Sequence, residues 1–393
     1  MSFSRRMPAD LQANALSDAL SDARATGRTW LDLTESNPTR AGFDYPDDLL
    51  APLADSRGLH YRPDALGAQV AREAVAADFA RRGTQVRPEH VMLTVSTSDA
   101  YSVLFKLLCD PGDEVLIPQP SYPLFEHLTR LDSIVSLPYR LEYHGQWSID
   151  VASIEAAMSP RTRAVLLVNP NNPTGSFVSA NDVDRLAALC AARDVAIISD
   201  EVFADYGFRG SSLINGAPLV GRADVLGFTM GGLSKSVGLP QVKLAWTAVS
   251  GSADHVAAAM LRLELICDTY LSVSTPVQLA LPELMARGAV IREQIQARVE
   301  RNLSHGARLV AQWPSCSLLR ADGGWSAVIR VPRLMTEEEL VLNLLNEHGV
   351  LVHPGYFFDF AEESYVIVSL LVPEPVFIEG VTRVLHACGS EAR

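Results

Sequence analysis

Seven short apolar segments recur between residues 91 and 249, and helical patterns separate several of them. Runs of Val, Ile and Leu that are joined by helices are typical of a mostly parallel sheet covered on both faces. Such sheets bind ligands beyond the carboxyl ends of their strands, so the polar residues that follow each strand become site candidates. The predicted strands are 91–95, 114–117, 134–137, 164–168, 195–199, 225–229 and 242–249, and the predicted helices are 100–108, 122–131 and 181–193.

The pattern differs on both sides of this region. Before it, the sequence predicts helices over 10–27 and 66–82 and a strand over 30–33; after residue 285 it predicts a long helix (289–313), a helix that begins after Thr336, and strands at 325–331, near 350 and at 365–371. Because 393 residues exceed the usual size of one core, we expect two domains. We predict a large α/β/α domain over 46–285, a smaller α+β domain over 286–393, and an N-terminal segment, 1–45, that packs with the smaller domain.

The composition narrows the classes of partner and cofactor. A net charge of −13 argues against nucleic-acid binding through a broad basic surface. The five cysteines are scattered without C-x-x-C spacing, so we expect neither disulfides nor a zinc ribbon, and a reducing cytoplasm fits. No apolar run is long enough for a membrane span, and the first residues do not form a secretory signal. The sequence lacks glycine-rich nucleotide motifs and H-E-x-x-H, so neither a dinucleotide nor a catalytic metal is predicted.

Lysine is scarce in this chain, and its placement is informative. Of 33 lysine and arginine residues only three are lysine. Two of these, Lys235 and Lys243, lie in one glycine-containing stretch, and Lys235 is the centre of its Ser-Lys-Ser turn. Arginine stays protonated and cannot act as an amine nucleophile, whereas a deprotonated lysine can form an imine with an aldehyde. A genomic preference for arginine codons explains the scarcity but not the position. We therefore interpret Lys235 as a covalent catalytic residue.

Polar residues follow three of the predicted strands. The turn Ser96-Thr97-Ser98 opens a helix, where it forms either an ordinary cap or a cup for a phosphate. Asn172 lies in a rigid Asn-Pro loop and can present its amide to a ligand oxygen. Asp200 and Glu201 end a buried strand. Burying an ionised carboxylate there is unfavourable unless a cationic group, such as the side chain of a local arginine, pairs with it.

The order of these features resembles that of the class I/II aminotransferases among the fold type I pyridoxal phosphate enzymes, over nearly the whole chain. The resemblance implies that Lys235 carries the cofactor as an internal aldimine and that Asp200 pairs with the pyridinium nitrogen. It further implies that Asn172 bonds the phenolic oxygen and that Tyr122 stacks on the ring. The other cofactor-binding residues that it implies are Ser96, Thr97, Ser98, Ser234 and Lys243, with Tyr61 reaching the phosphate of a neighbouring subunit in a homodimer with shared active sites.

Four positions depart from the family pattern. Phe203 replaces a tyrosine that donates to the phenolic oxygen, so either Asn172 acts alone or Tyr206 reaches in. Gly232 replaces a serine, and Lys243 replaces an arginine. Ile367 stands where the family places the arginine that binds the substrate carboxylate. Arg40, in the loop that contains Asn37, is a candidate substitute, and the aromatic run after His353 is a candidate substrate wall.

These features predict a cytoplasmic pyridoxal phosphate-dependent aminotransferase that acts on an amino acid and a 2-oxo acid, without a nucleic-acid or membrane partner. The missing arginine keeps open an alternative with the same cofactor, namely a lyase, decarboxylase or synthase. A ligand sensor attached to a DNA-binding module is a third class. We disfavour it because residues 1–45 are too short for a helix-turn-helix domain and are not strongly basic.

Overall fold

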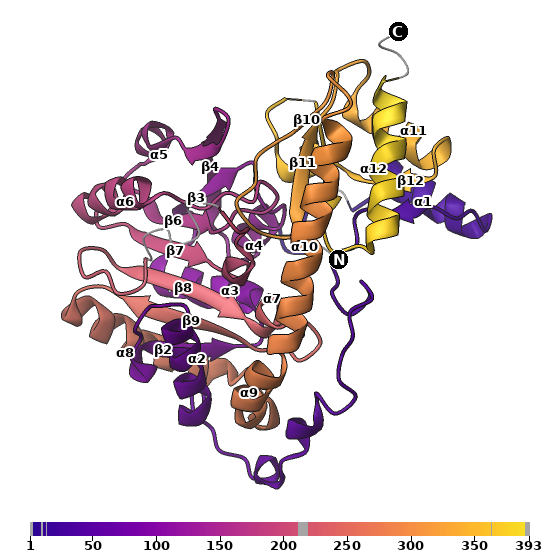
Figure 1. Cartoon of the computed structure of the whole chain (residues 1–393). Helices are drawn as coiled ribbons and strands as arrows, with labels where there is room; N and C mark the ends of the chain where they lie inside the picture. The colour runs from indigo at the N-terminus through magenta and orange to yellow at the C-terminus, as the bar shows by residue number, and fades with distance from the viewer. Residues whose placement is uncertain (1–2, 9–10, 13, 211–218, 363, 390–393) are drawn as a thin grey trace.

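The computed structural model describes residues 3–8, 11–12, 14–210, 219–362 and 364–389 (Figure 1). Its largest element is an eight-stranded sheet with the order β2-β9-β8-β7-β6-β3-β4-β5. Strands β8, β7, β6, β3 and β4 pair in parallel, while β9 is antiparallel to both of its neighbours and β5 is antiparallel to β4. The predicted mostly parallel sheet is thus confirmed. Its strands are β2 (Val91–Thr94), β3 (Glu114–Gln119), β4 (Val135–Tyr143), β5 (Trp147–Ile149), β6 (Thr162–Val168), β7 (Ala196–Asp200), β8 (Gly227–Gly232) and β9 (Ala245–Ser250).

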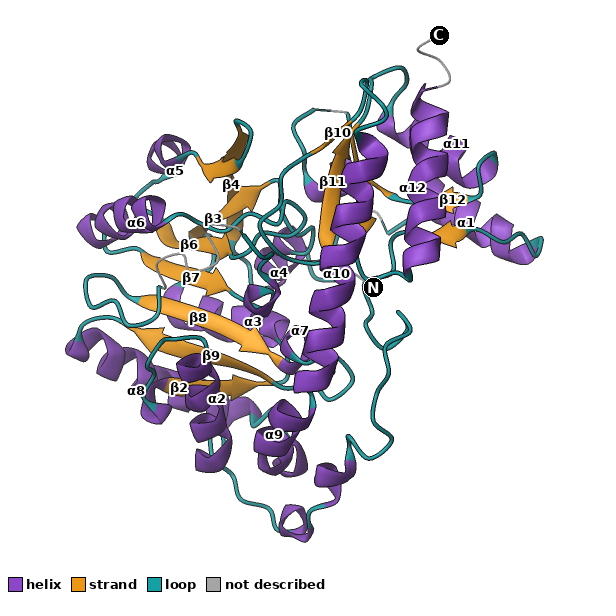
Figure 2. Cartoon of the chain, viewed as in Figure 1, coloured by secondary structure: helices purple, strands orange, loops and turns teal. Residues whose placement is uncertain are grey.

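Helices cover both faces of this sheet (Figure 2). One face packs against α3 (Thr97–Leu108), α4 (Phe125–Leu131) and α8 (Ala253–Tyr270), and the other against α5 (Val151–Ala157) and α6 (Ala180–Ala192). At the β2 end, α2 (Gln69–Arg81) packs against α9 (Thr275–Arg287). Helix α6 begins as predicted, because Ser179 Oγ accepts the N–H of Asp182 at 3.1 Å.

A second lobe lies beside the carboxyl edge of the large sheet. Its antiparallel sheet has the order β10 (Ser317–Leu318), β11 (Ser326–Arg330), β14 (Tyr365–Ser369) and β13 (His353–Pro354). The N-terminal part of the chain joins this lobe, since β1 (Leu31–Asp32) pairs in parallel with β12 (Val350–Leu351). The helices of this region are α1 (Ala15–Ala25), α10 (Ala289–Val310), α11 (Glu337–Asn346) and α12 (Glu374–Gly389). The predicted start of the first helix, at residue 10, lies outside the described residues.

Short helices connect the larger elements. They are η1 (Ala51–Ala54), η2 (Ser56–Leu59), η3 (Pro88–His90), η4 (Ala204–Tyr206), α7 (Leu233–Ser236) and η5 (Gly355–Phe358). Within the described part of the chain, no helix combines the length and apolarity needed to cross a membrane.

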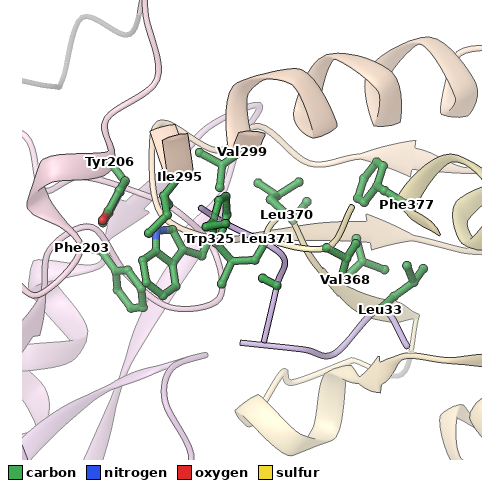
Figure 3. Packing of buried hydrophobic residues seen from close by; sticks show 14 of the residues in the cluster. Leu33, Phe203, Tyr206, Ile295, Val299, Trp325, Val368, Leu370, Leu371 and Phe377 are labelled. Carbon is green, nitrogen blue, oxygen red and sulfur yellow. The ribbon is translucent and has the colours of Figure 1, made fainter. Parts of the chain in front are cut away.

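One apolar cluster joins the two lobes (Figure 3). Trp325, directly before β11, lies edge-on to Phe203 and Tyr206, with ring centroids 5.3 and 5.1 Å apart. Behind it, Ile295 and Val299 of α10 are fully buried. Burial of large side chains across this boundary stabilises the placement of the second lobe against the sheet edge.

Candidate active site

The carboxyl edge of the large sheet brings together residues that are distant in the sequence. Strands β8, β7, β6 and β3 are consecutive neighbours. Lys235 lies in α7 directly after β8, Asp200 ends β7, Asn172 follows β6 and Tyr122 follows β3. Because these parallel strands all end at one edge, the four side chains share one region.

Asp200 is a buried carboxylate whose partners are hydrogen-bond donors. Its Oδ1 accepts the backbone N–H of Val202 at 3.1 Å, and its Oδ2 accepts the hydroxyl of Tyr101 at 3.2 Å. Burial raises the pKa of Asp200 to about 6, while both hydrogen bonds act in the opposite direction. The neighbouring Glu201 forms an ion pair with Arg82, with 3.4 Å between Glu201 Oε2 and Arg82 Nη1. Among the described residues, Asp200 itself has no cation within ion-pair distance.

Lys235 presents its amine beside two aromatic rings. Its Nζ lies 4.9 Å from the ring centroid of Trp325 and 5.6 Å from that of Phe203. Burial lowers the pKa of Lys235 to about 8, although the charge of Asp200 acts in the opposite direction. An appreciable fraction of the amine, roughly a tenth at neutral pH, is therefore uncharged and nucleophilic. Tyr206 donates its hydroxyl to the backbone carbonyl of Lys235, so this hydroxyl is used to hold the α7 turn.

The Asn-Pro loop after β6 contacts the second lobe. Asn172 Oδ1 accepts the hydroxyl of Ser326 at 3.4 Å, which ties the loop to β11. One residue earlier, Asn171 Nδ2 donates to Ser121 Oγ at 3.1 Å, and the N–H of Ser121 donates to the carbonyl of Phe358 at 3.0 Å. Within the described residues the side-chain N–H groups of Asn172 have no partner. They remain free to donate to a ligand oxygen.

The turn that opens α3 offers a cup for an anion, which we call the anion cup (Ser96–Ser98). Ser96 is the N-cap, and its Oγ accepts the N–H of Asp99 at 3.1 Å, so its side-chain oxygen already has a capping role. In the part of the chain that the structure describes, the hydroxyls of Thr97 and Ser98 have no hydrogen-bond partner. The free N–H groups and the positive dipole end of this helix of 12 residues are suited to a phosphate.

The groups at this edge match one class of cofactor. A buried carboxylate without a cation fits a ring nitrogen that carries a proton, and an amine with a lowered pKa fits an aldehyde. The anion cup fits a phosphate, and the tyrosine after β3 offers an aromatic face. The donor set therefore fits pyridoxal phosphate.

Comparison with known proteins decides the family. Residues 28–372 match the family described as aminotransferase class I and II. The chain belongs to the class I and II aminotransferases. It is 26% identical over 356 residues to glutamate-pyruvate aminotransferase AlaA from Escherichia coli, covering 88% of this chain and 87% of that protein. It is 27% identical over 365 residues to an alanine aminotransferase from Mycobacterium tuberculosis, covering 87% and 81%.

Solved structures confirm the fold of this aminotransferase. An alanine aminotransferase from Pyrococcus furiosus superposes with a TM-score of 0.87 at 22% identity, covering 99% of this chain and 100% of that one. The predicted fold type I architecture and the predicted enzyme class, a pyridoxal phosphate-dependent aminotransferase, are thus both confirmed.

Other predicted cofactor residues of this aminotransferase lie at the surface or in turns. Lys243 is exposed in the left-handed region, with φ 62°, and among the described residues its ammonium has no ion pair. Ser234 is half-buried beside the catalytic candidate. Tyr61 is 73% exposed. A Cβ at Gly232 would lie 3.2 Å from Ala245 Cβ, so the close approach of β9 favours glycine over the family's serine.

The predicted substrate residues have other contacts. Arg40 Nε lies 3.2 Å from Glu35 Oε2, and the Arg40 side chain is otherwise mostly exposed. Asn37 Oδ1 accepts the N–H and the hydroxyl of Thr39, so it stabilises its own turn. Ile367 is buried in an apolar cluster with Trp147, Leu319, Val328 and Phe358. None of these described contacts joins the three predicted residues to Lys235 or Asp200.

Three further residues at this site were not predicted from the sequence. Tyr101 lies four residues after Thr97 on α3, so helical spacing could have placed it on the same side of the helix. Trp325 and Ser326 belong to the second lobe and are about 90 residues from Lys235 in the chain. Their role depends on how the lobes pack, for which no local sequence signal exists.

Proposed function

We propose that this aminotransferase holds pyridoxal phosphate at the carboxyl edge of its large sheet and exchanges an amino group between an amino acid and a 2-oxo acid. The observation that carries the proposal is the pair formed by Lys235 and Asp200. The amine of Lys235 is partly neutral, and the buried carboxylate of Asp200 has no cation within ion-pair distance among the described residues. The charge of each group shifts the pKa of the other across the ends of β7 and β8. When bound, the cofactor supplies an aldehyde that receives the amino group and a ring that withdraws electrons from the substrate carbon.

Each side chain has a defined task in this proposal. Lys235 Nζ holds the cofactor covalently and, once released, moves a proton at the substrate Cα. Asp200 holds the proton on the ring nitrogen, and Asn172 donates to the ring oxygen. Tyr122 stacks on the ring, and the anion cup, Ser234 and Lys243 bind the phosphate.

We further propose that two copies of the chain form a homodimer with shared sites. Several large apolar side chains on α8 and beside its end are exposed, and we call them the exposed apolar face: Tyr61, Leu261, Leu265 and Tyr270. Leu261 and Leu265 are one helical turn apart and are 69% and 71% exposed. Tyr61 lines a pocket together with Leu271 at the end of α8, which connects the loop to the helix. A patch of this kind favours contact with a second protein surface.

A cytoplasmic location is part of the proposal. The five cysteines, all among the described residues, form no disulfide, and Cys190, Cys267, Cys316 and Cys388 are buried. Free buried thiols are typical of a reducing compartment.

Covalent capture of the cofactor tests the proposal. Pyridoxal phosphate should colour the wild-type protein, and borohydride should fix it to the peptide that contains Lys235. The Lys235→Arg protein should stay colourless, while a Lys106→Arg control should behave as wild type, because Lys106 on α3 is paired with Asp132. Borohydride labelling of any other peptide would refute the assignment of Lys235.

The amino transfer needs a second measurement. Amino donors, beginning with glutamate and alanine because of the relatives' names, should convert the coloured form to the amine form of the cofactor in a single turnover. A 2-oxo acid such as pyruvate should then restore the colour. Loss of carbon dioxide or of a side-chain fragment without this conversion would favour the lyase or decarboxylase alternative.

A further inference from the structure

Asp200 is held at both carboxylate oxygens, and one of its partners is a tyrosine on a different element. The backbone N–H of Val202 fixes Oδ1 from the same segment of chain. The hydroxyl of Tyr101 reaches Oδ2 from α3 at 3.2 Å. Positions 196, 198 and 200 of β7 face the sheet side that α3 covers, so the strand and the helix direct these two side chains toward one another.

The Tyr101 ring is fixed independently of its hydroxyl. It is buried, with its centroid 6.0 Å from that of Phe105 and 5.4 Å from that of Phe125, the latter edge-on. Phe125 in turn lies 6.2 Å from Tyr122, which follows β3. Loss of the hydroxyl alone therefore leaves the aromatic packing in place.

The chemistry of the two groups gives the hydrogen bond a direction. Burial and the neighbouring charge of Asp200 raise the pKa of Tyr101 well above its ordinary value. The phenol therefore stays protonated and acts as the hydrogen-bond donor. A hydrogen bond to a carboxylate favours the ionised form of that carboxylate. Burial alone would favour the neutral carboxylic acid. Because that form carries no negative charge, it interacts less favourably with a protonated ring nitrogen.

We propose that Tyr101 is a positioning residue for Asp200: its hydroxyl keeps the carboxylate ionised and oriented, so that the remaining lone pairs accept a hydrogen bond from the protonated ring nitrogen of the cofactor. The inference rests on the proposed function, because it concerns the same cofactor. In this proposal α3 interacts with both ends of the cofactor, through the anion cup in its first turn and through Tyr101 in its second turn.

The test compares Tyr101→Phe with Tyr139→Phe in the full-length protein. Both tyrosines are buried and each donates one hydrogen bond, Tyr139 to the carbonyl of Leu166 at 2.8 Å among the residues that face α5 and α6. Both variants should lose a similar amount of thermal stability without cofactor. Only Tyr101→Phe should weaken pyridoxal phosphate binding, by about tenfold in Kd, as expected for a lost hydrogen bond to a charged group.

A cofactor analogue separates positioning from general damage. With 1-deazapyridoxal phosphate, in which carbon replaces the ring nitrogen, Tyr101→Phe and wild type should bind with the same Kd. Equal weakening for both compounds, or no weakening for either, would overturn the proposal. If the wild type failed to bind pyridoxal phosphate at all, the proposed function itself would fail instead, so the two failures are distinguishable.

Discussion

The amine of Lys235 lies closer to the indole ring of Trp325, at 4.9 Å from its centroid, than to the ring of Phe203, at 5.6 Å. An aromatic face favours the charged form of a nearby ammonium by about 0.5–2 kcal/mol. Burial opposes this effect and is the largest cause of the lowered pKa. Through Trp325, the second lobe thus covers the amine of Lys235 and contributes to its electrostatic environment.

Trp325→Leu should therefore lower the pKa of Lys235 below its value of about 8. Leucine keeps the site apolar but lacks the π face, and the expected fall is about half to one pH unit. The rate at which the cofactor-free protein captures pyridoxal phosphate should follow the neutral amine, and its pH midpoint reports the pKa. Phe203→Leu should shift the midpoint less. The ring of Trp313 packs against His386, away from the site, so the control variant Trp313→Leu should not shift the midpoint. A midpoint that rises in Trp325→Leu contradicts this account.

Asp200→Asn should change how stability depends on pH. The folded-state pKa of Asp200, about 6, lies above its ordinary value of 3.8. The cost of burying the charge is thus absent below about pH 4 and fully present above about pH 6. Since asparagine cannot ionise, the free energy of unfolding of the variant should rise relative to wild type by about 2 kcal/mol between pH 4.5 and 7.5.

Urea unfolding of the cofactor-free proteins over this pH range measures the effect. Asp150→Asn is a control that should give no slope in this range, because the hydrogen bond from Arg140 lowers the pKa of Asp150 below its ordinary value of 3.8. Since Asp150 is ionised in both the folded and the unfolded protein above about pH 4.5, the difference in stability between that variant and wild type should not change with pH in this range. Parallel curves for Asp200→Asn and wild type would mean that the carboxylate at position 200 is not held at a raised pKa.

The parallel strands were predictable because each forms a continuous apolar run, and the site residues that directly follow them were predictable for the same reason. Asp200 was singled out in this way, whereas Lys235 was singled out by the scarcity of lysine in the chain. Strand β8 was predicted only to residue 229, since its last two residues are Gly231 and Gly232, which carry no side-chain signal. Strand β4 extends to Tyr143 at a partly exposed edge, where the apolar pattern fades, and the three-residue β5 that pairs with it was not predicted.

Two of the unpredicted helices, α8 and α12, have different explanations. On α8, Leu261 and Leu265 face outward, so apolar residues occur on both sides of the helix and blur its periodicity. Helix α12, by contrast, buries Phe377, Val381 and Val384 at helical spacing, a periodicity that predicts a helix. The contacts of Trp325 and Ser326 depend on how the two lobes meet, which residue patterns within one lobe do not encode.

Ile367→Arg should improve the binding of ordinary α-amino acids. Ile367 lies opposite Val328, and two residues along β11 the side chain of Ser326 bonds to Asn172, so the same sheet face leads to the candidate site. An arginine there could meet the Asn172 amide oxygen and a substrate carboxylate. Donor concentrations for half-saturation should fall about tenfold, the typical gain from a charge-assisted hydrogen bond.

The size-matched Ile367→Met protein is the control for this substitution and should leave donor binding unchanged. Both variants need a measured unfolding curve, because a buried arginine is costly in an apolar cluster. A folded Ile367→Arg protein with no tighter binding of any α-amino acid would show that the carboxylate is held elsewhere.

Leu265→Arg should split the proposed dimer. The substitution places a charge in the exposed apolar face, where Leu265 is 71% exposed, so it should cost the isolated chain little stability, about 0.5 kcal/mol or less. In the dimer the same charge would be buried without a partner, which costs several kcal/mol and shifts the equilibrium toward monomer. Sedimentation velocity should show this shift, and because Tyr61 could no longer reach the neighbouring site, bound pyridoxal phosphate should dissociate faster. Leu334→Arg, also at an exposed leucine but in the second lobe, should remain dimeric and keep its cofactor. If Leu265→Arg and wild type sediment alike, this face of α8 is not the subunit interface.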